Sequence, residues 1–201
     1  MRKTFGTILM ILGTALTAAA LSLFLFNQSE AQQAQESAAE LMPLLAEQIQ
    51  IRQAEAETQE TLPDPYEIPE MTVVDIDGYG YIGYLSIPAL GLELPVMADW
   101  SDSQLAIAPC RYAGSLFTDD LVIMAHNYTG HFGSLSRLSE GDSVVFVDMD
   151  GDAVAYEVVA LDVLAPTAVE EMTSGAYDLT LFTCTYGGQN RVSVYCDRTP
   201  D

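Results

Sequence analysis

The sequence predicts an all-β domain, a closed barrel or a sandwich, that follows an N-terminal membrane anchor. From residue 73 onward, seven or eight short β-rich runs fill about 125 residues with little helix between them. Asp77-Gly78 and Asp150-Gly151 separate pairs of these runs and are typical of tight hairpins. Ahead of the domain, residues 5–26 carry no charged side chain. The chain therefore divides into residues 1–26 (cytoplasmic flank and anchor), 27–72 (stalk and linker) and 73–201 (folded domain).

The charge balance excludes one class of function. The 201 residues include 29 acidic and 7 basic side chains, which gives a formal net charge of -22. A nucleic-acid-binding protein needs a basic surface to neutralise phosphates, so we expect no nucleic-acid partner. Lys3 is the only lysine. The folded domain therefore has no lysine amine that could act as a nucleophile.

Residues 5–26 are long and apolar enough to cross a bilayer. A helix needs about 20 apolar residues to span the hydrocarbon core, whereas the core of a cleaved signal peptide is only about 7–15 residues long. The basic flank Met1-Arg2-Lys3 should remain in the cytoplasm and leave the folded domain outside the cell. An uncleaved single-pass anchor is therefore favoured over a signal peptide.

The stalk is expected to be helical at first. Apolar residues recur at helical spacing at Leu41, Leu44, Leu45 and Ile49. Pro43 interrupts the pattern, so we expect two helical pieces rather than one. A solvated spacer is favoured over a self-associating helix. Three prolines within residues 62–69 then predict an extended linker.

One cysteine lies where two predicted strands meet. Residues 179–184 form a β-rich run that ends in Cys184, and after a Gly-Gly turn the next run begins with Arg191. His126 directly follows another apolar run, residues 121–125. A thiol becomes a strong nucleophile as its thiolate, and a nearby imidazole can accept its proton. Arg191 could then stabilise the charge on a carbonyl oxygen under attack. This pattern indicates covalent cysteine chemistry, with a structural core cysteine as the alternative.

The pattern resembles that of sortases, membrane-anchored cysteine transpeptidases of the Gram-positive cell surface. The resemblance rests on His126-Asn127 after the apolar run, on Thr180-Leu181-Phe182-Thr183-Cys184 and on Arg191 seven residues later, and it covers about residues 81–196. It implies a closed eight-stranded β-barrel. By position it implies Cys184 as nucleophile, His126 as general acid/base and Arg191 as electrostatic clamp, with Thr183 and Asn127 next to the substrate. The family commonly has glycine where Ala125 precedes the histidine, and His131 has no family counterpart and is interpreted as a loop residue.

The resemblance also implies a reaction and its partners. The enzyme would cleave an LPxTG-like sorting signal through a thioacyl-enzyme, and then transfer the protein to an amine of a peptidoglycan precursor or of a pilin lysine. The partners are then surface proteins or pilins that carry a sorting signal, and the resemblance assigns no cofactor and no metal. A cysteine endopeptidase that releases its product to water, and a catalytically inactive surface module, are the alternatives. The subclass stays open among class B-, C- and D-like sortases.

Other features carry separate predictions. The triplet Asp64-Pro65-Tyr66 resembles the lid of pilin-assembling sortases, which would place Asp64 or Tyr66 near Cys184; a proline-rich linker is the alternative. With three cysteines, Cys110 and Cys196 could form a disulfide and leave Cys184 free. The acidic residues 148–152 lack the later bidentate glutamate of a calcium loop, so a solvated hairpin is favoured there. Two further sets of residues complete the predictions: 99–107 and 132–138 as short helices, and 161–177 as part of a substrate groove.

Overall fold

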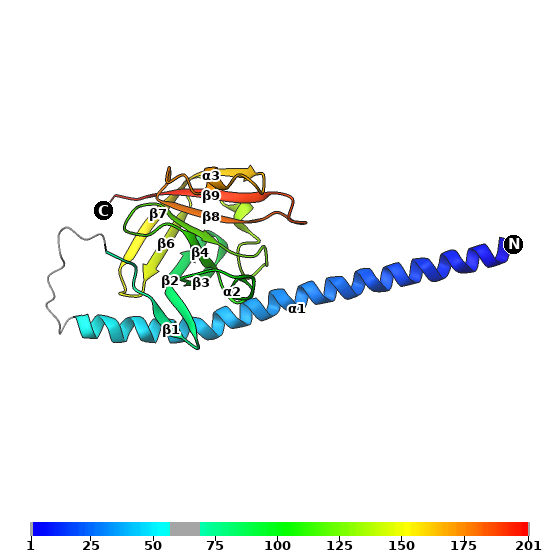
Figure 1. Ribbon diagram of the computed structural model, residues 1–201, viewed down its shortest axis with the longest axis horizontal. Helices are drawn as coiled ribbons and strands as arrows, with labels where there is room; N and C mark the ends of the chain where they lie inside the picture. Colours follow the sequence, from blue (N-terminus) through cyan, green and yellow to red (C-terminus); the bar gives the residue numbers. More distant parts are fainter. Residues whose placement is uncertain (1, 57–68, 201) are drawn as a thin grey trace.

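A β-barrel and one long helix dominate the part of the chain that the computed structural model describes, residues 2–56 and 69–200 (Figure 1). The strands are β1 (Val74–Ile76), β2 (Tyr79–Ile87), β3 (Leu92–Met97), β4 (Cys110–Ala113), β5 (Leu121–Met124), β6 (Ser143–Asp148), β7 (Ala153–Leu164), β8 (Leu179–Cys184) and β9 (Arg191–Arg198). The helices are α1 (Arg2–Ala56), α2 (Asp102–Leu105), α3 (Val169–Met172) and the 3₁₀ turns η1 (Pro88–Leu90) and η2 (Leu135–Arg137).

Eight of the strands close into a barrel, as predicted. Their order around the sheet is β2-β3-β4-β5-β8-β9-β7-β6, and pairing between β2 and β6 closes the ring. The short β1 adds a ninth strand beside the start of β2. Only the pairs β3–β4 and β5–β8 are parallel. Strand β4 was not predicted, and β7 continues to Leu164, so the first residues of the predicted groove loop 161–177 belong to the barrel instead.

The predicted hairpins and short helices are present. Gly78 and Gly151 turn the chain between β1 and β2 and between β6 and β7, each at φ +85°, a conformation that favours glycine. In the second hairpin the Asp148 carboxylate accepts the backbone N–H groups of Asp150 and Asp152 at 3.0 and 2.9 Å. These bonds within the chain organise the acidic turn, as expected of a hairpin. The short helices α2 and η2 lie within residues 99–107 and 132–138.

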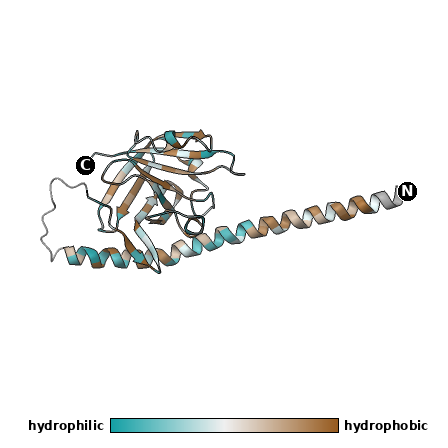
Figure 2. Cartoon of the chain, viewed as in Figure 1, coloured by the Kyte–Doolittle hydropathy of each residue, from teal (hydrophilic) through white to brown (hydrophobic). Residues whose placement is uncertain are grey.

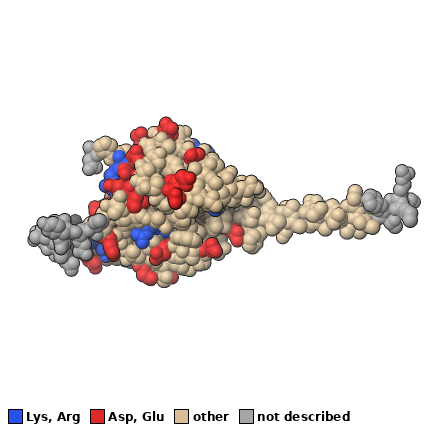
Figure 3. Space-filling view, turned by 45° about the horizontal axis from the view of Figure 1, so that its top comes forward, with Lys and Arg blue, Asp and Glu red and all other residues tan. Residues whose placement is uncertain are grey.

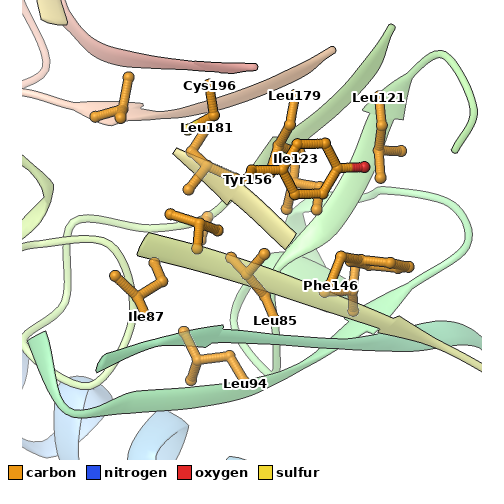
Figure 4. Close-up of a cluster of buried hydrophobic side chains, with 14 of the residues drawn as sticks. Leu85, Ile87, Leu94, Leu121, Ile123, Phe146, Tyr156, Leu179, Leu181 and Cys196 are labelled. Atoms are coloured by element: carbon orange, nitrogen blue, oxygen red, sulfur yellow. The ribbon is translucent and has the colours of Figure 1, made fainter. Parts of the chain in front are cut away.

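Alternation along the strands produces two hydrophobic clusters, one on each side of the barrel wall. In β5, Leu121 and Ile123 belong to the interior cluster, whereas Val122 and Met124 belong to an outer cluster. Figure 4 shows interior side chains that converge from β2, β3, β5, β6, β7, β8 and β9. The outer cluster includes residues of α1, α2 and α3, so the helices cover part of the barrel wall.

The proposed disulfide between Cys110 and Cys196 is absent, and that prediction is wrong. Both thiols are free and buried. Cys110 belongs to the outer cluster and Cys196 to the interior cluster. The two side chains therefore lie on opposite sides of the barrel wall, and no rotamer change could bring the sulfur atoms together.

Helix α1 differs from the prediction in two ways. It continues through Pro43 without a break, and its C-terminal half packs against the barrel instead of standing in solvent (Figure 1). The proline lies on the exposed side of the helix, whereas the buried side chains come from one stripe: Ala34, Ala38, Leu45 and Ile49. A proline costs helix stability by removing a hydrogen bond. Burial of the apolar stripe offsets this cost.

The first half of α1 is apolar and does not pack against the barrel. The side chains of residues 6–29 are all exposed, and Figure 2 shows most of this part as hydrophobic. This is the one helix of the described residues that is long and apolar enough to cross a membrane. The exposed apolar surface is consistent with the predicted anchor.

The end of α1 is attached to the β6–β7 hairpin. The Arg52 guanidinium forms an ion pair with the Asp150 carboxylate at 2.7 Å, and the Thr72 hydroxyl donates to the other carboxylate oxygen at 2.6 Å. Both charged side chains are more than a third exposed, so the pair contributes at most about 1 kcal/mol. Docking of the helix therefore depends mainly on its apolar stripe.

Replacing Leu45 with alanine is expected to destabilise the domain by roughly 2–5 kcal/mol, because it leaves a cavity between α1 and the outer cluster. The matched control is its neighbour Leu44, which is 42% exposed, compared with 0% for Leu45. Leu44→Ala should change the free energy of unfolding by less than about 0.5 kcal/mol. Denaturant unfolding of the full chain, followed by the fluorescence of the single tryptophan, Trp100, measures both. Equal effects of the two variants would contradict the observed docking of the helix.

Candidate active site

The parallel pairing of β5 and β8 brings the predicted histidine and cysteine to the same edge of the barrel. Met124 of β5 pairs with Phe182 of β8, and the Ala125 N–H continues the ladder by donating to the Phe182 carbonyl at 3.3 Å. His126 and Cys184 each follow these paired residues by two positions. In a parallel pair, equal offsets from a register point lie side by side. Both side chains are half-buried.

Arg191 reaches the same edge from the opposite side. It is the register partner of Cys184 across the antiparallel pair β8–β9. One guanidinium nitrogen of Arg191, Nη1, donates to the carbonyls of Gly188 and Asn190, each at 3.2 Å. The loop between the two strands thus holds the guanidinium of the residue that pairs with Cys184. Cys184 lies on the strand between those that carry the histidine and the arginine.

Two polar side chains connect the histidine segment to the cysteine segment. The buried Thr183 hydroxyl donates to the Ala125 carbonyl at 2.8 Å. The Asn127 side-chain amide donates to the Thr185 carbonyl at 3.4 Å. Both residues were predicted to lie next to the substrate, and the bonds that they form here are internal to the chain. They fix the relative positions of the thiol and the imidazole.

A cleft of about 400 Å³ opens at this edge of the barrel. Its lining comes from three segments of the chain: Asn127, Phe132, Gly133, Ser136, Thr183, Cys184, Thr185, Tyr186 and Val192. Tyr186 is 99% exposed, so its ring is free to contact a bound molecule. A larger hollow of about 570 Å³ lies between α1 and the β2–β3 connection, but no thiol or imidazole lines it.

The two histidines have different surroundings. Burial lowers the pKa of His126, and the carboxylates of Glu30 and Asp102 oppose this by favouring the imidazolium. His131 lies in a loop, as expected, and it is fully buried beneath α1. Burial and the neighbouring His126 lower the pKa of His131 to about 4, and hydrogen bonding to the backbone of Ile107 and Ala34 opposes this shift only in part. His131 is therefore neutral at physiological pH.

The three thiols should react very differently with an alkylating reagent. Burial raises the pKa values of Cys110 and Cys196 to about 12, whereas Cys184 lines the open cleft. Because the thiolate is the reactive species, we expect one adduct per native chain at neutral pH, on Cys184, and three after denaturation without reductant. Peptide mass spectrometry after iodoacetamide treatment checks this. A linked Cys110–Cys196 peptide would contradict the structure.

Two residues near the site, Tyr128 and Glu30, were not anticipated from the sequence. Tyr128 contacts His126 through its ring, and Glu30 of α1 accepts a hydrogen bond from the Tyr128 hydroxyl. No local motif marks either residue, because the contact depends on how α1 docks.

Asp64 and Tyr66, the proposed lid residues, lie outside the described residues. Among the residues that are described, no group of three or more His, Cys, Asp or Glu side chains could hold a metal ion.

Comparisons with known proteins identify the family to which the fold belongs. The family model described as Sortase domain matches residues 85–199, more than half of the chain. A search of curated proteins finds no match. Among solved structures, sortase C1 from Streptococcus suis is 29% identical, with a TM-score of 0.52, and the match covers 60% of this chain and 74% of that one.

Two further solved structures share the fold at lower identity. Sortase C from Streptococcus pneumoniae has a TM-score of 0.59 at 23% identity, with 83% of this chain and 97% of that chain covered. Sortase C from Clostridium perfringens has a TM-score of 0.51 at 24% identity, with 78% and 88% covered. The match to the family model and the shared barrel give one conclusion: this chain belongs to the sortase family.

Proposed function

We propose that this protein is a cysteine transpeptidase that cleaves a sorting signal and transfers the released protein to an amine. One observation supports the proposal: Cys184 is the register partner of Arg191, and Cys184 and His126 each follow the paired residues Phe182 and Met124 by two positions. Of these three residues, Cys184 lines the cleft that opens at this edge of the barrel. A nucleophile, a proton-transfer group and a fixed cation are the components that acyl transfer requires.

The proposed reaction has two steps. The Cys184 thiolate attacks the carbonyl carbon of the scissile peptide bond, and Arg191 stabilises the negative charge that develops on the carbonyl oxygen. His126 gives a proton to the leaving amine, the C–N bond breaks and a thioester remains on Cys184. An incoming amine then attacks the thioester and loses a proton to His126. The new amide forms and the thiolate is regenerated.

The substrates are proposed to be surface proteins or pilins with an LPxTG-like signal, and the acceptor an amine of peptidoglycan or of a pilin lysine. The structural relatives support this choice, since the Streptococcus pneumoniae structure is described in terms of pilin substrate specificity. Another structure, of the Clostridium perfringens enzyme, includes a C-terminal cell wall sorting motif. Thr183 and Asn127 form part of the proposed substrate cleft.

We also propose that the apolar part of α1 anchors the protein in the cell membrane, with the N-terminus in the cytoplasm and the catalytic domain outside. The exposed apolar surface and the basic flank Arg2-Lys3 support this orientation. Figure 3 shows many acidic and few basic side chains on the surface of the barrel. The described residues in the part of α1 that extends beyond the barrel show neither kind in this view. An acidic surface keeps such a domain soluble outside the cell.

Incubation of the full chain in detergent with a panel of LPxTG-like peptides tests the reaction. We expect intact-mass spectrometry to detect an acyl-enzyme with at least one peptide, and added triglycine to convert it into a ligated product. Hydrolysis alone at every triglycine concentration would support the endopeptidase alternative. No adduct with any peptide would favour an inactive surface module and contradict the proposal.

A further inference from the structure

We propose that Glu30 of the anchor helix, acting through Tyr128, is a positioning residue for the imidazole of His126. The helix that carries the membrane anchor would then supply part of the active site. This inference rests on the proposed role of His126 as the proton-transfer group. Glu30 does not contact the reacting atoms in this scheme; it acts on the histidine.

A continuous set of contacts connects the carboxylate to the imidazole. The Tyr128 hydroxyl donates to Oε2 of Glu30 at 3.4 Å, across 98 positions of the chain. On its other side the Tyr128 ring lies against the His126 ring, with centroids 4.7 Å apart and planes inclined at 33°. Tyr128 therefore contacts both the carboxylate and the imidazole. A shift of Glu30 would be transmitted to the surface on which the His126 ring packs.

The helix is closely fitted to this loop, so the contact is not an isolated surface bond. A Cβ atom on Gly130 would lie 2.8 Å from Cβ of Gln35, which leaves room only for glycine. Ala34, one turn beyond Glu30, is fully buried. His131 is also fully buried, with its ring 5.8 Å from the Tyr128 ring. The loop that follows His126 is thus packed directly under α1.

The charges around His126 give the contact a chemical consequence. Glu30 faces the ring from α1 and Asp102 from α2, and both favour the imidazolium, with Glu30 the larger influence. The other titratable or charged groups nearby are His131 and Tyr128 of the same loop, Cys184 of β8 and Arg191 of β9. Burial acts in the opposite direction and lowers the pKa of His126. Loss of the Glu30 charge should therefore lower that pKa further and reduce the imidazolium fraction.

The test compares Glu30→Gln with Glu36→Gln in the full chain in detergent. Glu36 lies on the same helix but is exposed, so its replacement removes the same charge without the contact. In Glu30→Gln, kcat/KM at neutral pH should fall about three- to tenfold, because a lower pKa of His126 leaves a smaller fraction of imidazolium. KM should stay unchanged, and the limb of the pH–rate profile that belongs to His126 should move to lower pH. Glu36→Gln should match the wild type.

A second pair of variants separates a charge effect from a packing effect. Tyr128→Phe keeps the ring against His126 and removes the hydroxyl that holds Glu30, so it should shift the profile in the same direction. If the two residues act as one unit, the double variant Glu30→Gln/Tyr128→Phe should resemble Glu30→Gln alone. Glu30→Asp should restore part of the wild-type activity. Full additivity of the two substitutions would overturn the proposed connection through Tyr128.

A titration of the histidine ring separates this inference from the proposed function. His126 and His131 are the only histidines, so their NMR signals can be assigned with one His126→Gln variant. The measurement is made in a Cys184→Ala background and needs no turnover. A lower pKa of His126 in Glu30→Gln supports the inference even if no peptide reacts, in which case only the proposed function fails. An unchanged titration in an enzyme that is active on peptides overturns the role of Glu30 alone.

Discussion

Replacing Cys184 with alanine is expected to abolish acyl-enzyme formation and to reduce peptide transfer by at least about 10⁴-fold. The thiolate is the only covalent nucleophile in the proposed reaction, and losses of this size or larger follow removal of a comparable nucleophile. Because Cys184 lies at the open end of β8, its truncation leaves both hydrophobic clusters intact. The melting temperature should therefore stay close to that of the wild type.

The other cysteines provide the matched control for this variant. Cys110→Ala makes the same chemical change at a thiol that is fully buried in the outer cluster. It should lower stability modestly, as expected for a small core truncation, and leave the rate of transfer per folded molecule unchanged. Transfer that survives in Cys184→Ala, measured by intact mass and by ligation of triglycine, would refute the assignment of the nucleophile.

Replacing Arg191 with alanine is expected to lower kcat/KM by about 10²–10³-fold, because loss of one oxyanion-stabilising donor costs this much in comparable sites. Arg191 lies directly opposite Cys184, and the loop carbonyls of Gly188 and Asn190 fix its guanidinium. The effect should fall mainly on kcat, since the charge develops in the transition state. Steady-state kinetics with the best peptide of the panel measures it.

Arg198 supplies the control for the arginine. It ends the same strand, seven residues from Arg191 and about 23 Å away along an extended chain. Arg198 forms an ion pair with Asp119 at 2.8 Å and donates to the Leu116 carbonyl. Arg198→Ala should therefore change stability slightly and leave kcat/KM within about twofold, as for a surface substitution away from the site. An equal loss in both variants would indicate a general charge effect instead of a specific clamp.

The elements that the sequence predicted well are those with a local signal. Short β-rich runs mark most of the strands, and Asp-Gly pairs mark the hairpins at Gly78 and Gly151. The positions of Cys184 and Arg191 on either side of one hairpin turn follow from the Gly-Gly pair between them. Each of these features depends on residues close together in the chain. Propensity and turn geometry are sufficient to predict them.

The features that were missed depend on contacts between distant parts of the chain. Helix α1 docks because Ala34, Ala38, Leu45 and Ile49 pack against the barrel. Small residues such as the two alanines, in an otherwise polar helix, produce only a weak hydrophobic pattern in the sequence. The contact between Glu30 and Tyr128 joins residues 98 positions apart. The disulfide prediction failed because cysteine counting ignores the wall between Cys110 and Cys196. Strand β4 has only four residues, and its central Arg111-Tyr112 carries no clear alternation.

With α1 as the proposed membrane anchor, its unbroken course would set the height of the proposed active site above the membrane. Glu30 follows Phe26, the last residue of the apolar run, by four positions, which is about 6 Å along a helix axis. The headgroup layer on one side of a bilayer is about 5–7 Å thick. A rigid rod with the barrel fixed to it would therefore keep the loop of His126 at the level of the lipid headgroups. An active site at this level would act on a substrate segment that lies close to the membrane surface, and not on one that extends far into the cell wall.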